Sequence, residues 1–371
     1  MHPKQAIFNS NRLKLGTFMT NVSSGMAATR IPERWKLTWQ ANVDAAKLLD
    51  EAGIEFMVPL ARFRGYGGEY DYQGEQYEAI TWATGLLAHT RRLTVFSTVL
   101  VPMIHPVLAA KQLVTADHVG GGRAALNIVC GWNEDEMRMF GLDTRDQKER
   151  YEYGQEWWDI VRRIWTSEEH FDHEGKYFKL GSVIGRPKLL SSDRMPVMNA
   201  GKTASGRAFA VRNADMLFVI LEDLESGRKE AAEVHAAAAQ AGRKVSVCTP
   251  LTIVCRPTRR EAEEFYRHYA VEEADTHAVD RYLRMRGATA HRFPQEMIDV
   301  WRERFSAGHG CYPVVGDPDG VAQGLARVAD AGFGGVTMGF VDYVKELPLF
   351  CSEVLPRLER MGLRQPMAAA A

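Results

Sequence analysis

The stretch LTVFSTVLVPMIHPVLAAKQLVTADHVGGGRAALNIVCGWNEDE, residues 93–136, decides the fold. It contains two apolar runs, 93–101 and 124–130, with a helical pattern over Pro106–His118 between them. The apolar runs are nearly continuous rather than alternating, which is typical of parallel strands covered on both faces. The stretch therefore predicts one strand–helix–strand unit of a parallel α/β sheet.

The same alternation extends over the whole chain. Strands are predicted at 13–19, 55–61, 93–101, 124–130, 195–200, 214–220, 245–255 and 334–340. Helices are predicted at Glu33–Asp50, Gln76–Ala88, Pro106–His118, Gln147–Trp165, Ser205–Arg212, Leu224–Gln240, Arg259–Val271, Pro318–Ala331 and Asp342–Arg360. Eight such repeats predict a (β/α)8 TIM barrel, α/β in class and one domain over residues 1–371; a doubly wound sheet is the alternative. Thr144 and Gln147 are expected to cap the fourth helix.

Two segments, 166–194 and 272–312, do not fit the repeat. The first contains FDHEGKYFKL, a predicted hairpin that turns at Glu174-Gly175. The second contains two polar helical patterns, Asp275–Arg286 and Gln295–Arg304. Long insertions between strand and helix commonly build or cover the site of a barrel, so we expect the second segment to form a lid.

Composition limits the classes of partner. The 371 residues carry a formal net charge of −1, with 46% hydrophobic and 25% charged residues, which is ordinary for a soluble globular protein. Such a balance gives no overall field for nucleic acid or an anionic membrane, and no apolar run is long enough to span a bilayer. The five cysteines are scattered without a CxxC pair, so we predict no zinc site and a reducing cytoplasm. The acidic and histidine residues over 168–174 are interpreted as a solvated surface, with no metal site.

Two polar residues stand out near the predicted carboxyl ends of strands, where a barrel carries its active site. Asn127 interrupts an apolar strand, and a buried amide must find hydrogen-bond partners. It either contacts a ligand in the upper barrel or caps a bend. His105, between Ile104 and Pro106, is either an acid–base group or a turn histidine.

The segment NAGKTASGRAFA, residues 199–210, reads as a strand, a glycine turn and a helix. Backbone N–H groups of Gly201 and the hydroxyl of Thr203 or Ser205 at a helix N-terminus suit a phosphate monoester. The alternative is a simple N-cap. Pro196 occupies the position where a P-loop needs glycine, which excludes a nucleoside-triphosphate loop.

Four motifs together resemble a known family: ARFRGYGG (61–68), the block 96–136, KERYEYGQEWWDIVRRIW (148–165) and NAGKTASGRAFA (199–210). The chain resembles the bacterial-luciferase-like superfamily of flavin-dependent monooxygenases from Leu13 to about Leu363. Within it, the chain is most similar to the group of pyrimidine and sulfone monooxygenases.

The resemblance implies FMN, used as FMNH2, with O2 as co-substrate. It implies that Asn127 and Thr98 position oxygen beside the flavin, through either its N5 or its C4a atom. Substrate contacts are expected from Asn21 and Arg62, with His105 in acid–base chemistry. The residues expected to hold the cofactor are Ala61, Arg62, Asn127, Glu136, Arg150, Tyr151, Gly201, Thr203 and Ser205.

The resemblance also implies a function. We expect the oxygenase component of a two-component enzyme, which receives FMNH2 from a separate NAD(P)H:flavin reductase, since nothing in the chain supplies a nicotinamide site. The expected substrate is a small pyrimidine- or amide-like heterocycle or an organosulfur compound, and the expected assembly is a homodimer or homotetramer. The alternatives are a deazaflavin (F420)-dependent oxidoreductase and a non-catalytic flavin-binding protein of the same fold.

Overall fold

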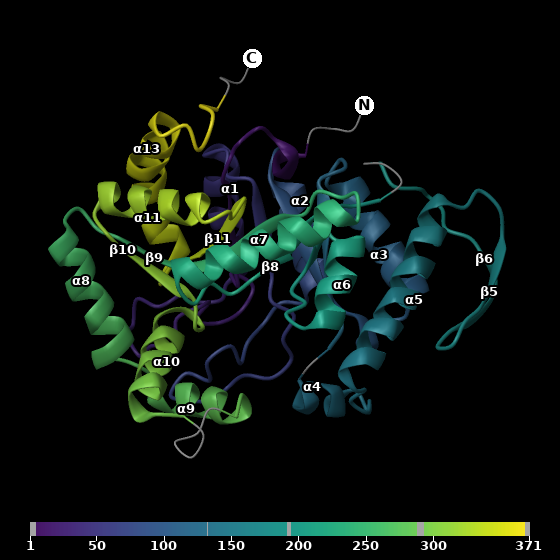
Figure 1. The fold of residues 1–371 in the computed structure, drawn as a ribbon, viewed down its shortest axis with the longest axis horizontal. Coiled ribbons are helices and arrows are strands. Elements are labelled where there is room, and N and C mark those ends of the chain that lie inside the picture. The colour runs from purple at the N-terminus through teal and green to yellow at the C-terminus, as the bar shows by residue number, and fades with distance from the viewer. Residues whose placement is uncertain (1–4, 132, 191–193, 288–292, 368–371) are drawn as a thin grey trace.

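The computed structural model describes residues 5–131, 133–190, 194–287 and 293–367, and contains a closed barrel of parallel strands (Figure 1). The strands pair in the order β1-β2-β3-β4-β7-β8-β9-β11, and β11 pairs with β1 to close the ring. This confirms the predicted (β/α)8 barrel. The barrel strands are β1 Lys14–Phe18, β2 Phe56–Val58, β3 Thr94–Leu100, β4 Ala124–Val129, β7 Val197–Asn199, β8 Met216–Phe218, β9 Ser246–Cys255 and β11 Gly335–Gly339.

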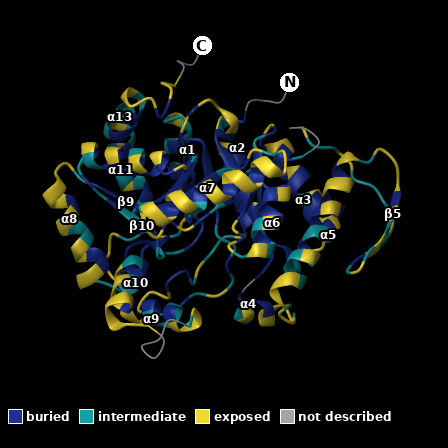
Figure 2. Cartoon of the chain, in the orientation of Figure 1, coloured by how far each residue is buried: buried dark blue, intermediate teal, exposed yellow. Residues whose placement is uncertain are grey.

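Burial explains why the apolar runs become strands. Every residue of β2, β3 and β11 is buried, because the barrel interior covers one face of each strand and the surrounding helices cover the other. Figure 2 shows mostly buried strands behind helices whose outward faces are exposed. The carboxyl ends of the strands are thereby held in one rigid rim.

The helices begin where polar side chains cap them. Thr38, Asp146, Asp223 and Asp317 each accept a hydrogen bond from a backbone N–H of the first turn. The helices around the barrel are α1 Trp39–Glu51, α2 Ala79–His89, α3 Pro106–Val119, α5 Gln147–Thr166, α6 Ala204–Asn213, α7 Leu224–Gln240, α8 Arg259–Arg267, α11 Pro318–Asp330, α12 Tyr343–Leu349 and α13 Leu355–Arg360.

Three details of the helix prediction are wrong. The first helix begins at Trp39 rather than Glu33, because Thr38 provides the cap. Asp146, not Thr144, caps α5 by accepting from Glu149 N at 2.9 Å. The helices predicted as continuous after residues 259 and 342 each contain a π-helical turn, at His268–Glu272 and Phe350–Val354.

One strand, β10 Tyr312–Gly316, was not predicted from the sequence. It pairs in parallel with Leu251–Cys255, the second half of the long strand β9, while the first half of β9 stays in the barrel. The strand is short and contains Pro313, which a ladder tolerates at an edge. Those features weaken the strand pattern in the sequence.

Both predicted insertions are present. The hairpin forms from β5 Phe171–Glu174 and β6 Lys179–Val183 and projects from the body of the molecule (Figure 1). The second insertion contains α9 Thr276–Met285 and α10 Gln295–Gly308. In Figure 1, α9, α10 and the short helix α4 Glu134–Met139 lie at the lower end and α13 at the upper end. None of the described helices is long and apolar enough to cross a membrane.

Candidate active site

A cavity of about 540 Å³ lies at the carboxyl ends of the barrel strands. It is lined by residues that follow β2, β4, β7 and β8, together with side chains of the second insertion. This is the place where TIM barrels carry their sites, and the volume is typical of a small-molecule pocket. The predicted site residues that line it are Ala61, Arg62, Thr98, Asn127, Arg150, Tyr151, Gly201 and Thr203.

Asn127 and Thr98 face each other across neighbouring strands β4 and β3. Asn127 Nδ2 donates to Thr98 Oγ1 at 3.1 Å, and the Thr98 hydroxyl donates to the Pro59 carbonyl at 2.5 Å. Within the described part of the chain, the buried Oδ1 atom of Asn127 accepts no hydrogen bond. A buried acceptor without a donor costs about 1–3 kcal/mol, so this atom favours a ligand that brings an N–H or O–H group to the cavity.

The N-terminus of α6 forms a second part of the cavity wall. Thr203 caps this helix by accepting from Gly206 N at 3.4 Å. A Cβ atom built on Gly206 would lie 2.6 Å from the Tyr151 hydroxyl, and one on Gly201 would lie 2.5 Å from Gly206 backbone. The two glycines therefore allow the turn, the helix and the phenol to approach closely, as an anion cradle requires.

Tyr151 is suited to donate a hydrogen bond there. Burial raises the pKa of its hydroxyl to about 12, an effect that nearby Cys130 adds to and Arg150 opposes. The phenol stays protonated at neutral pH, beside the positive end of the α6 dipole. Ser205 lies in the same first turn but does not line the cavity.

Arg150 joins α5 to the loop after β4. Its Nη1 atom donates to the Gly131 carbonyl at 2.5 Å. Its buried Nε atom has no hydrogen-bond partner among the described residues, and the side chain lines the cavity. Arg150 Nε is thus a second buried polar atom, after Asn127 Oδ1, that could bind a ligand, and it lies near the turn at the N-terminus of α6.

Glu136 does not line the cavity but holds a loop that does. Its carboxylate accepts from Phe63 N at 2.9 Å and lies 3.6 Å from Arg62 Nη1, with both side chains at least 96% buried. The Arg62 guanidinium also lies over the Tyr66 ring at 4.7 Å. Removing the acid would leave a buried cation without its carboxylate, so the pair fixes the orientation of Arg62.

The structure does not bring Asn21 or His105 to the cavity. Asn21 is fully buried and its amide is bonded to backbone: it accepts from Leu60 N and donates to the Leu60 and Tyr77 carbonyls. His105 is exposed, caps α3 by accepting from Val107 N at 3.3 Å, and packs edge-on against Phe178. Both residues thus have local structural roles, which corrects the expectation of substrate contact and acid–base chemistry.

The second insertion supplies cavity residues that the sequence analysis missed: Tyr282, Arg286, His309 and Cys311. His309 follows α10 with a left-handed backbone, φ 56°. Burial, with the cations Arg62 and Arg286, lowers its pKa to about 3. The flanking glycines at 308 and 310 were the available sequence signal, because they mark an irregular turn around a titratable residue.

The depressed pKa of His309 predicts a loss of stability in mild acid. Below about pH 6.5 the unfolded chain binds a proton at this residue, whereas the folded imidazole stays neutral down to about pH 3. The contribution of His309 to the free energy of unfolding is therefore fully present above about pH 6.5 and is lost as the pH is lowered. Between pH 7 and 5 the loss is about 2 kcal/mol. Urea unfolding of wild type and His309→Gln should show this difference; equal acid slopes would contradict it.

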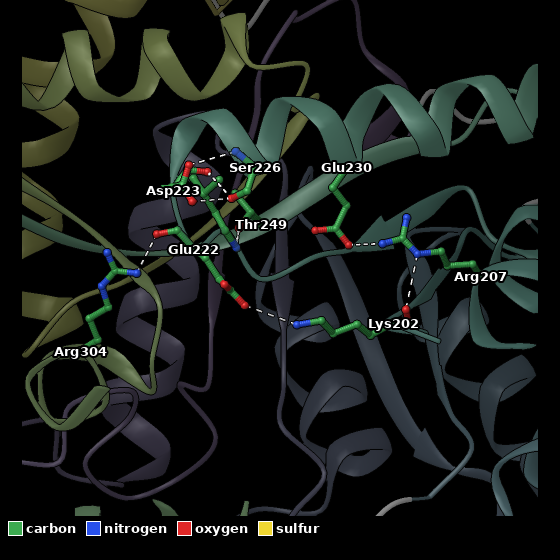
Figure 3. Close-up of polar contacts among 9 residues, drawn as sticks. Lys202, Arg207, Glu222, Asp223, Ser226, Glu230, Thr249 and Arg304 are labelled. Carbon is green, nitrogen blue, oxygen red and sulfur yellow. Dashed lines mark hydrogen bonds and ion pairs between the residues drawn. The ribbon is translucent and has the colours of Figure 1, made fainter. Parts of the chain in front are cut away.

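At the edge of the cavity, polar contacts join the α6 turn to the second insertion (Figure 3). Lys202 Nζ lies 3.5 Å from Glu222 Oε1, and Arg304 Nη1 donates to the Glu222 carbonyl at 2.7 Å. Arg207 binds Glu230, whose side chain lines the cavity. The loop after β8 therefore connects the anion cradle to α10, although the Lys202–Glu222 pair is exposed and contributes little energy.

The acidic and histidine residues of the hairpin make local contacts. His173 Nε2 lies 3.1 Å from Glu156 Oε1, and His170 Nδ1 lies 3.1 Å from the Ser182 carbonyl. In the described ranges, no group of three or more His, Cys, Asp or Glu side chains is arranged to hold a metal ion.

Comparison with known proteins identifies the class. The luciferase-like monooxygenase family model matches residues 13–334, so the chain belongs to that family. This confirms the predicted family and class of enzyme, an oxidoreductase.

Individual relatives cover almost the whole chain. It is 26% identical to an FMNH2-dependent dimethylsulfone monooxygenase of Pseudomonas putida, over 97% of this chain and 99% of that protein. It is 24% identical to the pyrimidine monooxygenase RutA of Stutzerimonas stutzeri, over 94% and 97%. The crystal structure of DmoA from Hyphomicrobium sulfonivorans has the same fold, with a TM-score of 0.85, 20% identity and coverage of 97% and 91%.

Proposed function

We propose that the protein is the oxygenase component of a two-component monooxygenase. It takes FMNH2 from a separate NAD(P)H:flavin reductase and uses O2 to oxidise a small pyrimidine- or amide-like heterocycle or an organosulfur compound. The prediction of FMN as the cofactor is confirmed by the dimethylsulfone monooxygenase relative, which is FMNH2-dependent. The observation that carries the proposal is one cavity that joins an anion cradle to the Asn127–Thr98 pair.

The residues present fit FMN. The α6 N-terminus, Thr203 and Tyr151 offer N–H and O–H donors to the phosphate, where the helix dipole favours a dianion. The orphan atoms Asn127 Oδ1 and Arg150 Nε are a buried acceptor and a buried donor in the same cavity. The Asn127 acceptor matches an N–H group on the edge of a heterocycle, and the Arg150 donor, near the α6 turn, matches a phosphate oxygen.

The residues of this chain bind the cofactor and substrate, orient the reacting groups and exclude water from the cavity. When bound, reduced FMN supplies the two electrons with which O2 gives one oxygen atom to the substrate and the other to water. Thr98, fixed by the Pro59 carbonyl, orients the Asn127 amide, which provides a placed dipole at the site of oxygen chemistry. Tyr282 and the apolar Phe18 line the cavity, and such side chains help to exclude water from it.

Further properties belong to the same proposal. We propose a cytoplasmic protein, since all five cysteines are free thiols. We also propose that it assembles as a homodimer or homotetramer. Glu136 supports the cofactor site indirectly through Arg62. Ser205 lies in the first turn of α6 and does not line the cavity, so we propose that it supports the cofactor site as part of this turn.

Oxygen uptake tests the proposal against its alternative. Photoreduced FMN with protein, O2 and a panel of pyrimidines, amides and sulfones should give an oxidised product, identified by mass spectrometry. Reduced F420 in place of FMN should give neither oxygen uptake nor product. Substrate reduction by F420 without O2 would contradict the monooxygenase assignment.

A further inference from the structure

His309 occupies the side of the cavity opposite the anion cradle. The cradle follows β7, next to β4, whereas His309 bonds to Tyr72 in the loop after β2, near the β1–α1 loop. In the closed ring these groups lie across the barrel mouth from each other. With the phosphate of FMN on α6 and its ring near Asn127, the His309 side remains for the substrate.

The hydrogen bonds of Tyr72 determine the tautomer of His309. The Tyr72 hydroxyl has one proton, which it donates to the Met26 carbonyl at 2.9 Å, and it accepts from Gln73 Nε2 at 3.0 Å. The Met26 carbonyl is the nearer of the two acceptors of this proton, so we assign the 3.2 Å contact with His309 Nδ1 to a proton carried by Nδ1. A neutral imidazole protonated at Nδ1 has a bare Nε2, which accepts hydrogen bonds and does not donate them.

The cavity wall around His309 offers mainly hydrogen-bond donors, so an acceptor at His309 Nε2 would select ligands that carry a donor. Arg62 and Arg286 line the same cavity, and a guanidinium carries donors and no acceptor. Both cations also oppose protonation of His309, so the imidazole stays neutral at working pH. No described residue hydrogen-bonds Nε2 of His309. Its left-handed backbone, which costs a non-glycine residue energy, is consistent with a functional position.

We infer that His309 determines substrate specificity: its Nε2 atom accepts a hydrogen bond from an N–H or O–H group of the substrate. The inference rests on the proposed function and narrows its substrate class. A molecule with neighbouring C=O and N–H groups, as in an amide or imide, can receive a donor from an arginine and give its own proton to His309. A simple sulfone carries acceptors only and leaves Nε2 unsatisfied.

Matched probes test this inference with the FMN-loaded protein. Succinimide and N-methylsuccinimide differ in the donor, and dimethyl sulfone serves as an acceptor-only compound. Calorimetric titration should show that succinimide binds at least about tenfold more tightly than the other two. His309→Gly removes the acceptor at a backbone position that glycine favours and should abolish most of this preference. His309→Gln places an amide oxygen near the former Nε2 position and should restore part of it.

The outcomes separate the inference from the proposed function. Equal binding of the two imides by wild type, no binding of either, or a preference that persists in His309→Gly would overturn the role of His309. So would a loss of FMN affinity in His309→Gly with the imide preference unchanged, which would assign Nε2 to the cofactor. A wild-type protein that fails to bind FMN contradicts the proposed function itself.

Discussion

Replacing Asn127 with leucine is expected to leave a folded protein that binds FMN but forms product about a hundredfold more slowly. Leucine is similar to asparagine in volume but has no dipole. The substitution removes both the orphan Oδ1 atom and the hydrogen bond from Nδ2 to Thr98. These two changes have opposite effects on stability, so the stability of the protein without ligand should change little. Hydrogen peroxide from reduced FMN should rise as product falls, because oxygen is activated but no longer positioned.

Stopped-flow oxidation of reduced FMN, with product and peroxide measured in parallel, provides the readout. Asn42→Leu is the matched control, because Asn42 is also buried but lies on α1, where its amide accepts from Trp82 Nε1 at 2.8 Å. The control should lose stability while each folded molecule couples normally. Normal turnover and coupling by a folded Asn127→Leu protein would refute the role of the amide.

Combining Thr203→Ala with Tyr151→Phe is expected to weaken FMN binding by at least about a hundredfold and riboflavin binding far less. Two hydrogen bonds to a dianion contribute about 1.5–3 kcal/mol each, and riboflavin lacks the phosphate that receives them. The raised pKa of Tyr151 keeps its hydroxyl protonated, so its donor is present across neutral pH.

Fluorescence titration with both ligands measures the difference. Thr258→Ala is the control, because Thr258 also caps a helix, α8, and does not line the cavity. It should lower stability by about 1 kcal/mol and leave the affinity for both ligands unchanged. If the double variant loses FMN and riboflavin equally, the phosphate does not bind at α6.

The barrel, the Asn127–Thr98 pair and the α6 turn of the candidate site can be predicted from short-range sequence patterns. Asn127 and Thr98 each lie in the carboxyl half of an apolar strand, and parallel pairing in register makes them neighbours. The α6 cradle is likewise a local feature, since the turn, the cap and the helix are contiguous in sequence. Such features can be predicted because strand period and helix capping act over a few residues.

The errors come from features that depend on distant packing. His309 reaches the cavity only because α9 and α10 fold over the rim, and no periodic pattern encodes that placement. Asn21 resembles a ligand contact in sequence, yet the backbone of a distant loop uses its amide. His105 had a readable signal, because a residue before proline at the first helical position is an N-cap candidate.

Anaerobic titration with photoreduced FMN, followed by mixing with O2, is the most direct test of the central claim. Tryptophan fluorescence reports binding, and the same titration with reduced F420 gives the comparison. The account predicts saturable binding of reduced FMN, weakened by Thr203→Ala with Tyr151→Phe, and oxidation of the bound flavin when O2 is added. Failure to bind reduced FMN, or tighter binding of F420 with no reaction toward O2, would contradict it.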